Sequence, residues 1–307
     1  MFTNPSRVAF EIGNRPVYWY GILLAASVLA AMFFALKSAK RYRWKEDDMI
    51  DVCLLAVPLG VVFARIYYVV FSWSTYASNP LSILYLWEGG LAIYGALLGG
   101  VIGVFIYARW KKRSIIELMD VIFPGVALAQ AIGRWGNFIN QEAFGIEITN
   151  KAWMWFPFAV RIDATNTIHY ATFFYESLWC LGIFFFLWFY RSRFTRRGDV
   201  VAVYAMLYGF ERALIEGLRT DSLMLGPLRI SQIVSALLFV GIAVYFVIRR
   251  VKYRANPLPI TNPLNPGYSW PDEVEKAPEE EEPLADTEPA VEAEAAAETE
   301  PAEETEP

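Results

Sequence analysis

The 307-residue sequence has one histidine, His169, and two cysteines, Cys53 and Cys180, which both lie inside apolar runs. So few thiols exclude a disulfide framework. With one imidazole and no cysteine cluster, a zinc site has almost no ligands available, and we expect neither a metal nor another cofactor. Long apolar runs also exclude a soluble globular enzyme.

Acidic residues are scarce before residue 271. The last 37 residues hold 16 Asp/Glu and one Lys, so the rest of the chain has 26 Lys/Arg against 16 Asp/Glu and a net charge of about +10. We expect the tail, residues 272–307, to be a disordered cytoplasmic appendage, because it is too charged to bury a core. A Pro-rich linker, residues 255–271, precedes it.

Seven mostly apolar stretches of roughly 20 residues have the length of a membrane-spanning helix. The fold class that we predict is therefore an all-α integral membrane protein, with a seven-span membrane domain over residues 1–254. The predicted spans are residues 17–36, 49–71, 89–109, 115–134, 172–190, 199–217 and 229–248.

Basic residues set the expected orientation of these spans. They gather after the first, third, fifth and seventh spans, whereas residues 72–88 have none. Because short cytoplasmic loops are enriched in Lys and Arg, we place the N-terminus outside and the C-terminus in the cytoplasm. One sizeable segment, about residues 135–171, then lies outside the membrane between the fourth and fifth spans.

Four arginines break the positive-inside pattern, because they lie in or beside the outer halves of spans: Arg65, Arg134, Arg212 and Arg219. An arginine within the bilayer costs about 2.5–3.5 kcal/mol on insertion scales, so such residues normally face a protein interior. Guanidinium groups at one depth suit the phosphate of an outer-leaflet lipid. Structural ion pairing is the alternative, and Arg212 with Glu216 is an obvious i,i+4 pair.

A polar segment ends the fourth span. Residues 133–145 read Gly-Arg-Trp-Gly-Asn-Phe-Ile-Asn-Gln-Glu-Ala-Phe-Gly and bring five polar side chains to the membrane edge. An unsatisfied polar group in hydrocarbon costs several kcal/mol, so the segment must line a polar cavity or satisfy itself. A helix end capped by amides is the alternative.

This segment resembles the signature of prolipoprotein diacylglyceryl transferases, Gly-Arg-x-Gly-Asn-Phe-x-Asn-x-Glu-x-x-Gly, and meets every fixed position from Gly133 to Gly145. The similarity covers about residues 10–250. It implies transfer of the diacylglyceryl group of phosphatidylglycerol to the lipobox Cys thiol of a preprolipoprotein, with release of glycerol 1-phosphate. The implied partners are this lipid, lipobox signal peptides and the bacterial cytoplasmic membrane, and no nucleic acid.

The resemblance also implies the site residues, with Arg134 and Arg212 as phosphate ligands. Our hypothesis is that Glu142 and Glu216 orient these two guanidiniums. The implied catalytic positions are Arg134, Arg212, Tyr94, Glu142 and Asn137, and the implied phosphatidylglycerol-binding positions are Arg134, Arg212, Tyr20, Gly145, Glu216, Arg65 and Arg219.

The general base stays open. The family often has histidine in a His-Gly-Gly run of the third span, where this sequence has Tyr94. A phenol with a pKa of about 10 is mostly protonated at neutral pH and is a poor base. Either Tyr94 works in another way or the base lies elsewhere; His169 is a candidate, and a surface histidine is the alternative reading of it.

Two other function classes fit part of the sequence. A transporter or flippase for an anionic lipid would use the same intramembrane arginines, but we find no internal repeat, and the candidate groups lie toward one leaflet. A membrane scaffold would use the acidic tail as its working part. Glycines 99, 100 and 103 in the third span favour close helix packing whatever the function.

Overall fold

The structure is a computed structural model that describes residues 5–13, 15–86, 89–220, 224–225 and 228–271. The chain divides into two compact units, Met1–Tyr268 and Ser269–Pro307. The acidic tail expected over residues 272–307 lies outside the described residues, so the fold below is that of the first unit.

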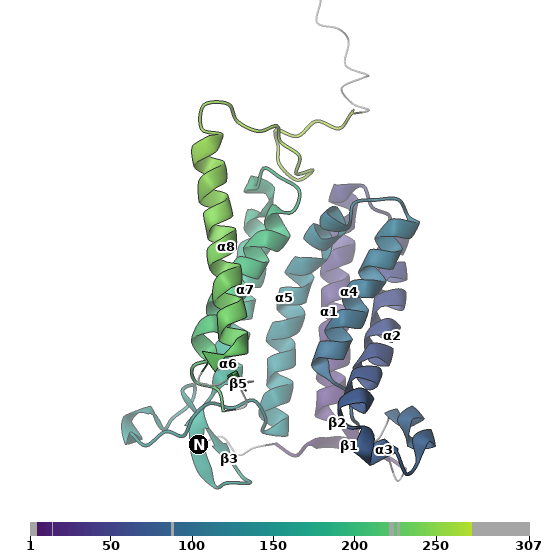
Figure 1. Ribbon diagram of the computed structural model, residues 1–307, viewed down its shortest axis with the longest axis vertical. Coiled ribbons are helices and arrows are strands. Elements are labelled where there is room, and N and C mark those ends of the chain that lie inside the picture. Colours follow the sequence, from purple (N-terminus) through teal and green to yellow (C-terminus); the bar gives the residue numbers. More distant parts are fainter. Residues whose placement is uncertain (1–4, 14, 87–88, 221–223, 226–227, 272–307) are drawn as a thin grey trace, which may run out of the picture. The chain divides into compact units, whose positions relative to one another are not determined.

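Among the described residues of this unit, seven long helices run side by side (Figure 1). Each lies on one of the predicted spans: α1 (Trp19–Ala39), α2 (Glu46–Phe71), α4 (Ile93–Trp110), α5 (Ile115–Asn140), α6 (Thr172–Tyr190), α7 (Asp199–Ile215) and α8 (Ile230–Lys252). Among the described residues, six helices are long and apolar enough to cross a membrane. The exception is α7, which has 17 residues.

Three short antiparallel hairpins accompany the helices among the described residues, and the fold remains mostly helical, as predicted. They pair β1 (Val8–Ile12) with β2 (Arg15–Tyr18), β3 (Ala159–Ile162) with β4 (Thr167–Tyr170), and β5 (Met224–Leu225) with β6 (Leu228–Arg229). All three lie beside the ends where α1, α6 and α8 begin, and we call this the hairpin end. Short helical turns complete the structure at Lys40–Tyr42, Trp73–Tyr76 (α3), Pro80–Leu84, Lys151–Trp153 and Arg191–Arg193.

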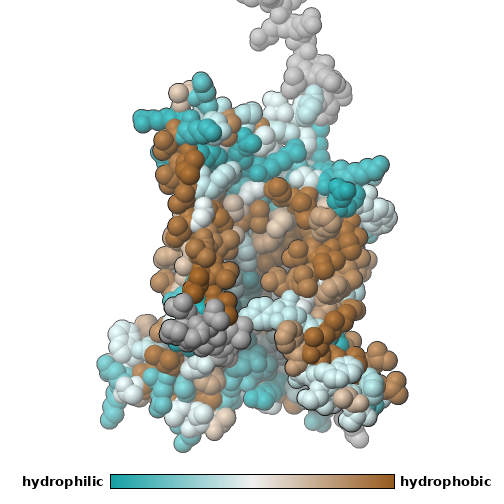
Figure 2. Space-filling model, in the orientation of Figure 1, coloured by the Kyte–Doolittle hydropathy of each residue, from teal (hydrophilic) through white to brown (hydrophobic). Residues whose placement is uncertain are grey.

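The outer surface of the helices is apolar. Figure 2 shows a belt of hydrophobic residues over the middle of the helices, between two more hydrophilic ends. Large side chains point outward along this belt, such as Leu54 and Leu97 at 68% and 67% exposure. An exposed apolar belt of this kind is stable only in a lipid environment. The chain is therefore a mostly helical, multi-pass integral membrane protein.

Glycines let α4 lie directly on α2. A Cβ atom on Gly99 would collide with the backbone oxygen of Leu59, and one on Gly103 would lie 2.7 Å from the Cα atom of Ala56. Gly95 meets the α2 backbone in the same way, whereas Gly100 faces open space. The close packing expected from the sequence is therefore confirmed, with Gly95 in place of Gly100 in the contact.

A substitution at this contact tests the packing. We expect Gly99→Ala to destabilise the fold by about 1–3 kcal/mol, because its methyl group overpacks a backbone contact that cannot give way. Gly100→Ala on the same helix is the matched control and should melt like the parent chain in detergent. Equal melting temperatures for the two variants would contradict the close α2–α4 contact.

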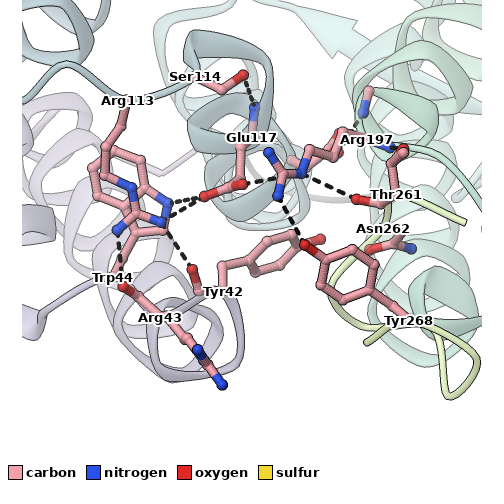
Figure 3. A network of polar contacts seen from close by, with 12 residues as sticks. Tyr42, Arg43, Trp44, Arg113, Ser114, Glu117, Arg197, Thr261, Asn262 and Tyr268 are labelled. Carbon is pink, nitrogen blue, oxygen red and sulfur yellow. Dashed lines mark hydrogen bonds and ion pairs between the residues drawn. The ribbon is translucent and has the colours of Figure 1, made fainter. Parts of the chain in front are cut away.

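Basic residues gather at the opposite end, in the last turns of α1, α4 and α8 and in the turn Arg191–Arg193 that follows α6. A polar network ties the chain together there (Figure 3). We call this the basic end. Glu117 of α5 accepts a hydrogen bond from Trp44 Nε1 at 2.9 Å, and it pairs with Arg113 at 2.6 Å and Arg197 at 3.3 Å. Arg197 also donates to the backbone oxygen of Thr261 at 3.0 Å.

The segment after α8 is held by the same end. Asn262 is fully buried, and its side-chain amide donates to the backbone oxygens of Arg191 and Phe194 at 2.9 and 2.8 Å. Part of the Pro-rich segment expected as a linker is thus hydrogen-bonded to the helical unit. The basic end is fixed by these bonds, and the signature residues lie at the hairpin end.

Candidate functional site

The signature segment covers the end of α5 and the turn that follows. The helix stops at Asn140 because Gln141 adopts a left-handed backbone conformation, with φ of 54°. The turn brings Glu142 back onto the helix end, where Asn137 Nδ2 donates to Glu142 Oε1 at 2.9 Å and the amide of Asn140 lies 3.4 Å from the same oxygen. The helix end itself is capped by backbone N–H groups, since Gln141 N donates to the oxygen of Phe138 and Glu142 N to that of Asn137. The side-chain amides instead hold the Glu142 carboxylate beside this end.

Five charged residues form a compact cluster between α5, α6 and α7. At its centre is Glu176 of α6, whose side chain is 1% exposed. Glu176 Oε2 lies 2.5 Å from Arg134 and 3.5 Å from Arg212, and Glu176 Oε1 lies 3.2 Å from Arg219. Arg212 also pairs with Glu216 at 2.7 Å. We call these five residues the arginine cluster.

The cluster confirms one predicted pairing and corrects another. Arg212 and Glu216 pair one turn apart on the chain, as their i,i+4 spacing indicates. Arg134, however, is held by Glu176, whereas Glu142 binds the amides of Asn137 and Asn140. Glu176 was not among the site residues predicted from the sequence, although a carboxylate near the outer end of an apolar span was an available signal.

The cluster keeps two guanidiniums partly open. The side chains of Arg134 and Arg212 are each 17% exposed, although their carboxylate partner is almost fully buried. Three guanidiniums and two carboxylates leave one positive charge in excess. A buried, preorganised set of donors with excess positive charge suits an anionic group such as a phosphate.

An open pocket of about 770 Å³ lies beside the end of α5, where Arg7, Tyr20, Asn140 and Glu142 line it. Gly136 allows this arrangement, because a Cβ atom there would lie 2.7 Å from the ring of Tyr20. Arg7 donates to the backbone oxygen of Asn140 at 2.9 Å and so ties the first hairpin to the signature turn. The structure thus brings the predicted residues Tyr20 and Glu142 to one pocket.

Gly145 acts through its backbone. Its nitrogen donates to the oxygen of Tyr170 at 3.0 Å, and it forms an isolated β-bridge with Arg219. A Cβ atom at this position would lie 2.7 Å from Tyr170 Cβ and 3.2 Å from the oxygen of Leu218. The signature glycine therefore joins the end of its turn to the chain segment that carries Arg219.

Arg65 and Tyr94 lie apart from the cluster. Arg65 is buried, and its guanidinium donates to backbone oxygens of the loop before α4, at 2.8 Å for Ser82 and 2.6 Å for Gly89. Among the described contacts, none joins Arg65 to the other arginines. Tyr94 stands at the start of α4 with half of its side chain exposed, and its ring centroid lies 6.2 Å from that of Tyr67.

His169 is buried in β4, so reading it as a surface histidine is wrong. Its Nδ1 lies 2.8 Å from the oxygen of Gly145, and its Nε2 lies 2.7 Å from Thr167 Oγ1. Both ring nitrogens are thus engaged: Nδ1 joins the hairpin to the signature turn, and Nε2 bonds within strand β4. Over the residues that the structure describes, no group of three or more His, Cys, Asp or Glu side chains could hold a metal ion.

Comparisons with known proteins agree with the signature. Residues 7–248 match the family model described as prolipoprotein diacylglyceryl transferase. Proteins named phosphatidylglycerol–prolipoprotein diacylglyceryl transferase are 42% identical in Lactococcus lactis, with 82% of this chain and 97% of the relative covered, and 45% identical in Clostridioides difficile, with 76% and 92% covered. A relative of this name in Limosilactobacillus reuteri is 44% identical over 81% of this chain and 92% of its own length. The chain belongs to the prolipoprotein diacylglyceryl transferase family.

Proposed function

We propose that this chain transfers the diacylglyceryl group of phosphatidylglycerol to the lipobox Cys thiol of a preprolipoprotein, the first step of bacterial lipoprotein maturation. The relatives bear this activity in their names, and the match covers most of their length. The observation that carries the proposal is the arginine cluster, in which Arg134 and Arg212 keep part of their guanidiniums open beside the buried Glu176.

The chemistry needs what this cluster supplies. The substrate sulfur forms a bond to the glycerol carbon that carries the phosphate ester, and the carbon–oxygen bond breaks with its electron pair on the leaving oxygen. Negative charge therefore grows on the phosphate as glycerol 1-phosphate departs. Guanidiniums fixed before the reaction stabilise this charge without having to reorganise. We assign Arg134 and Arg212 to the phosphate, with Arg219 as their neighbour.

The nucleophile belongs to the substrate, so the enzyme needs no reactive cysteine of its own. The substrate thiol, with an ordinary pKa of about 8.5, must lose its proton during attack. Glu142 faces the pocket with Tyr20 and Asn140, and Asn137 holds it in place. We therefore assign this pocket to the polar part of a substrate. Arg134 lies on the last turns of α5, close to the pocket residue Asn140 along the helix, and we propose that the bound substrate extends to it. Tyr94 stays a candidate through the family motif alone.

We infer a seven-span topology in a bacterial cytoplasmic membrane, with the N-terminus outside. The basic residues in the last turns of α1, α4 and α8, and in the turn Arg191–Arg193 after α6, support a cytoplasmic basic end. The seventh span would be α7, which packs against α5, α6 and α8 despite its shorter length. The hairpin end would then face the outer leaflet. Residues 1–254 would be the catalytic domain, and 255–271 and 272–307 the linker and the cytoplasmic tail.

A transfer assay tests the function. The full chain, purified in detergent, is mixed with phosphatidylglycerol and a lipobox peptide that carries either Cys or Ser. We expect glycerol phosphate release only with the Cys peptide, together with a mass gain of one diacylglyceryl group on that peptide. A folded protein that binds the lipid but releases nothing would contradict the proposal and favour a lipid transporter.

A further inference from the structure

A second carboxyl group lies beside the arginine cluster and takes no part in its ion pairs. Glu211 precedes Arg212 on α7, and its side chain points into the protein, with 4% of the residue exposed. Among the residues that the structure describes, neither of its carboxyl oxygens has a hydrogen-bond partner. The mechanism proposed above makes no use of this group.

Charged and titratable groups surround Glu211 on several elements. They are Arg134 from α5, Glu176 and Cys180 from α6, Arg212 from α7 and Arg219 just beyond it. Arg229, at the start of α8, reaches the same corner and donates to the backbone oxygen of Glu216. The three arginines of the cluster direct their described ion pairs to Glu176 and Glu216.

A buried carboxylate that accepts no hydrogen bond is much costlier than a neutral carboxylic acid, because it loses its hydration without replacement. The charge balance of the site points the same way. With Glu211 neutral, the arginine cluster keeps one positive charge in excess, and an ionised Glu211 would cancel it. The phosphodiester of phosphatidylglycerol carries one negative charge, which the excess positive charge matches.

We propose that Glu211 holds its proton in the resting site and thereby preserves the excess positive charge with which the arginine cluster binds the lipid phosphate. Glu211 is then a positioning residue. It does not touch the lipid, and it affects lipid affinity through the charge that Arg134 and Arg212 present to the phosphate. The inference rests on the phosphate site proposed above. A unit charge placed about 10 Å from the phosphate, at an effective dielectric constant of about 20, changes binding about tenfold.

Infrared spectroscopy tests whether Glu211 is protonated, and a lipid-binding measurement tests whether its proton sets the affinity for phosphatidylglycerol. The difference spectrum between the parent protein and Glu211→Gln should contain the carbonyl stretch of one protonated carboxylic acid, since the other acids cancel. Phosphatidylglycerol binding is measured without peptide, so the substrate thiol plays no part. As the pH rises, the band should disappear and the affinity of the parent protein for phosphatidylglycerol should fall about tenfold over the same pH range. We expect no such fall, or affinity step, in Glu211→Gln.

Tyr204→Phe is the matched control, because it removes a buried hydroxyl of α7 that bonds Gln130 at 2.7 Å, outside the cluster. It should keep the affinity step of the parent. Should Glu211→Gln fail to fold, Glu211→Met serves the same comparison. The inference is overturned if the difference spectrum lacks the band, if the affinity step also appears in Glu211→Gln, or if that variant binds about tenfold more tightly at neutral pH.

Failure of the phosphate site would look different. In that case Arg134→Gln and Arg212→Gln would bind phosphatidylglycerol like the parent protein, whatever the infrared spectra report. If those two variants lose binding while the Glu211 comparison gives one of the contrary results, the phosphate site stands and only the role of Glu211 is wrong.

Discussion

Arg134→Gln and Arg212→Gln should each reduce kcat/KM for diacylglyceryl transfer by about 10²–10³-fold, the usual loss when one preorganised donor is removed from a developing negative charge. Each variant keeps a hydrogen-bonding side chain but loses the positive charge. Glu176 retains two arginine partners in either case, so we expect the fold to survive. Glycerol phosphate release, measured with melting temperature in detergent, checks both statements.

Two further variants sharpen this prediction. Arg212→Lys retains the charge but lacks the planar fork that reaches Glu176 and Glu216 together, so its activity should lie between those of the parent and Arg212→Gln. Arg193→Gln removes an exposed arginine at the basic end and is the control for a change of net charge. Parent-like activity in Arg134→Gln or Arg212→Gln would remove that arginine from the site.

Glu176→Gln should cost both stability and activity. It leaves three guanidiniums without the carboxylate that they share, and breaking a buried ion pair by removing one partner costs about 3–5 kcal/mol. We expect a larger fall in melting temperature than for Arg134→Gln. Because Arg134 and Arg212 then lose their fixed positions, transfer should fall by at least about 10²-fold in the protein that stays folded.

The control for Glu176 is a carboxylate at the same end that lies outside the cluster. Glu147 is exposed, so Glu147→Gln should leave melting temperature and transfer at parent values. If Glu176→Gln behaved like Glu147→Gln, the three arginines would not depend on Glu176, and the centre of the cluster would have to be sought elsewhere.

Local patterns in the sequence predicted the helices well. Each apolar stretch of membrane length became a long helix, because backbone groups in an apolar medium must bond within the segment. The pair Arg212 and Glu216 was also predictable, since i,i+4 positions share a helix face. The signature from Gly133 to Gly145 identified the family from the residues alone, in agreement with the family model.

Which groups meet across helices was decided by the tertiary structure. Glu176 lies 36 residues from Arg212 and 43 from Arg219, and no local pattern says that these side chains face each other. Arg65 has the same expected depth in the membrane as the other arginines. Its guanidinium nevertheless donates to backbone oxygens of the loop before α4, away from the cluster. His169 and Glu211 could not be assigned for the same reason. Their partners depend on how each helix or strand is rotated against its neighbours, and long-range packing alone fixes that rotation.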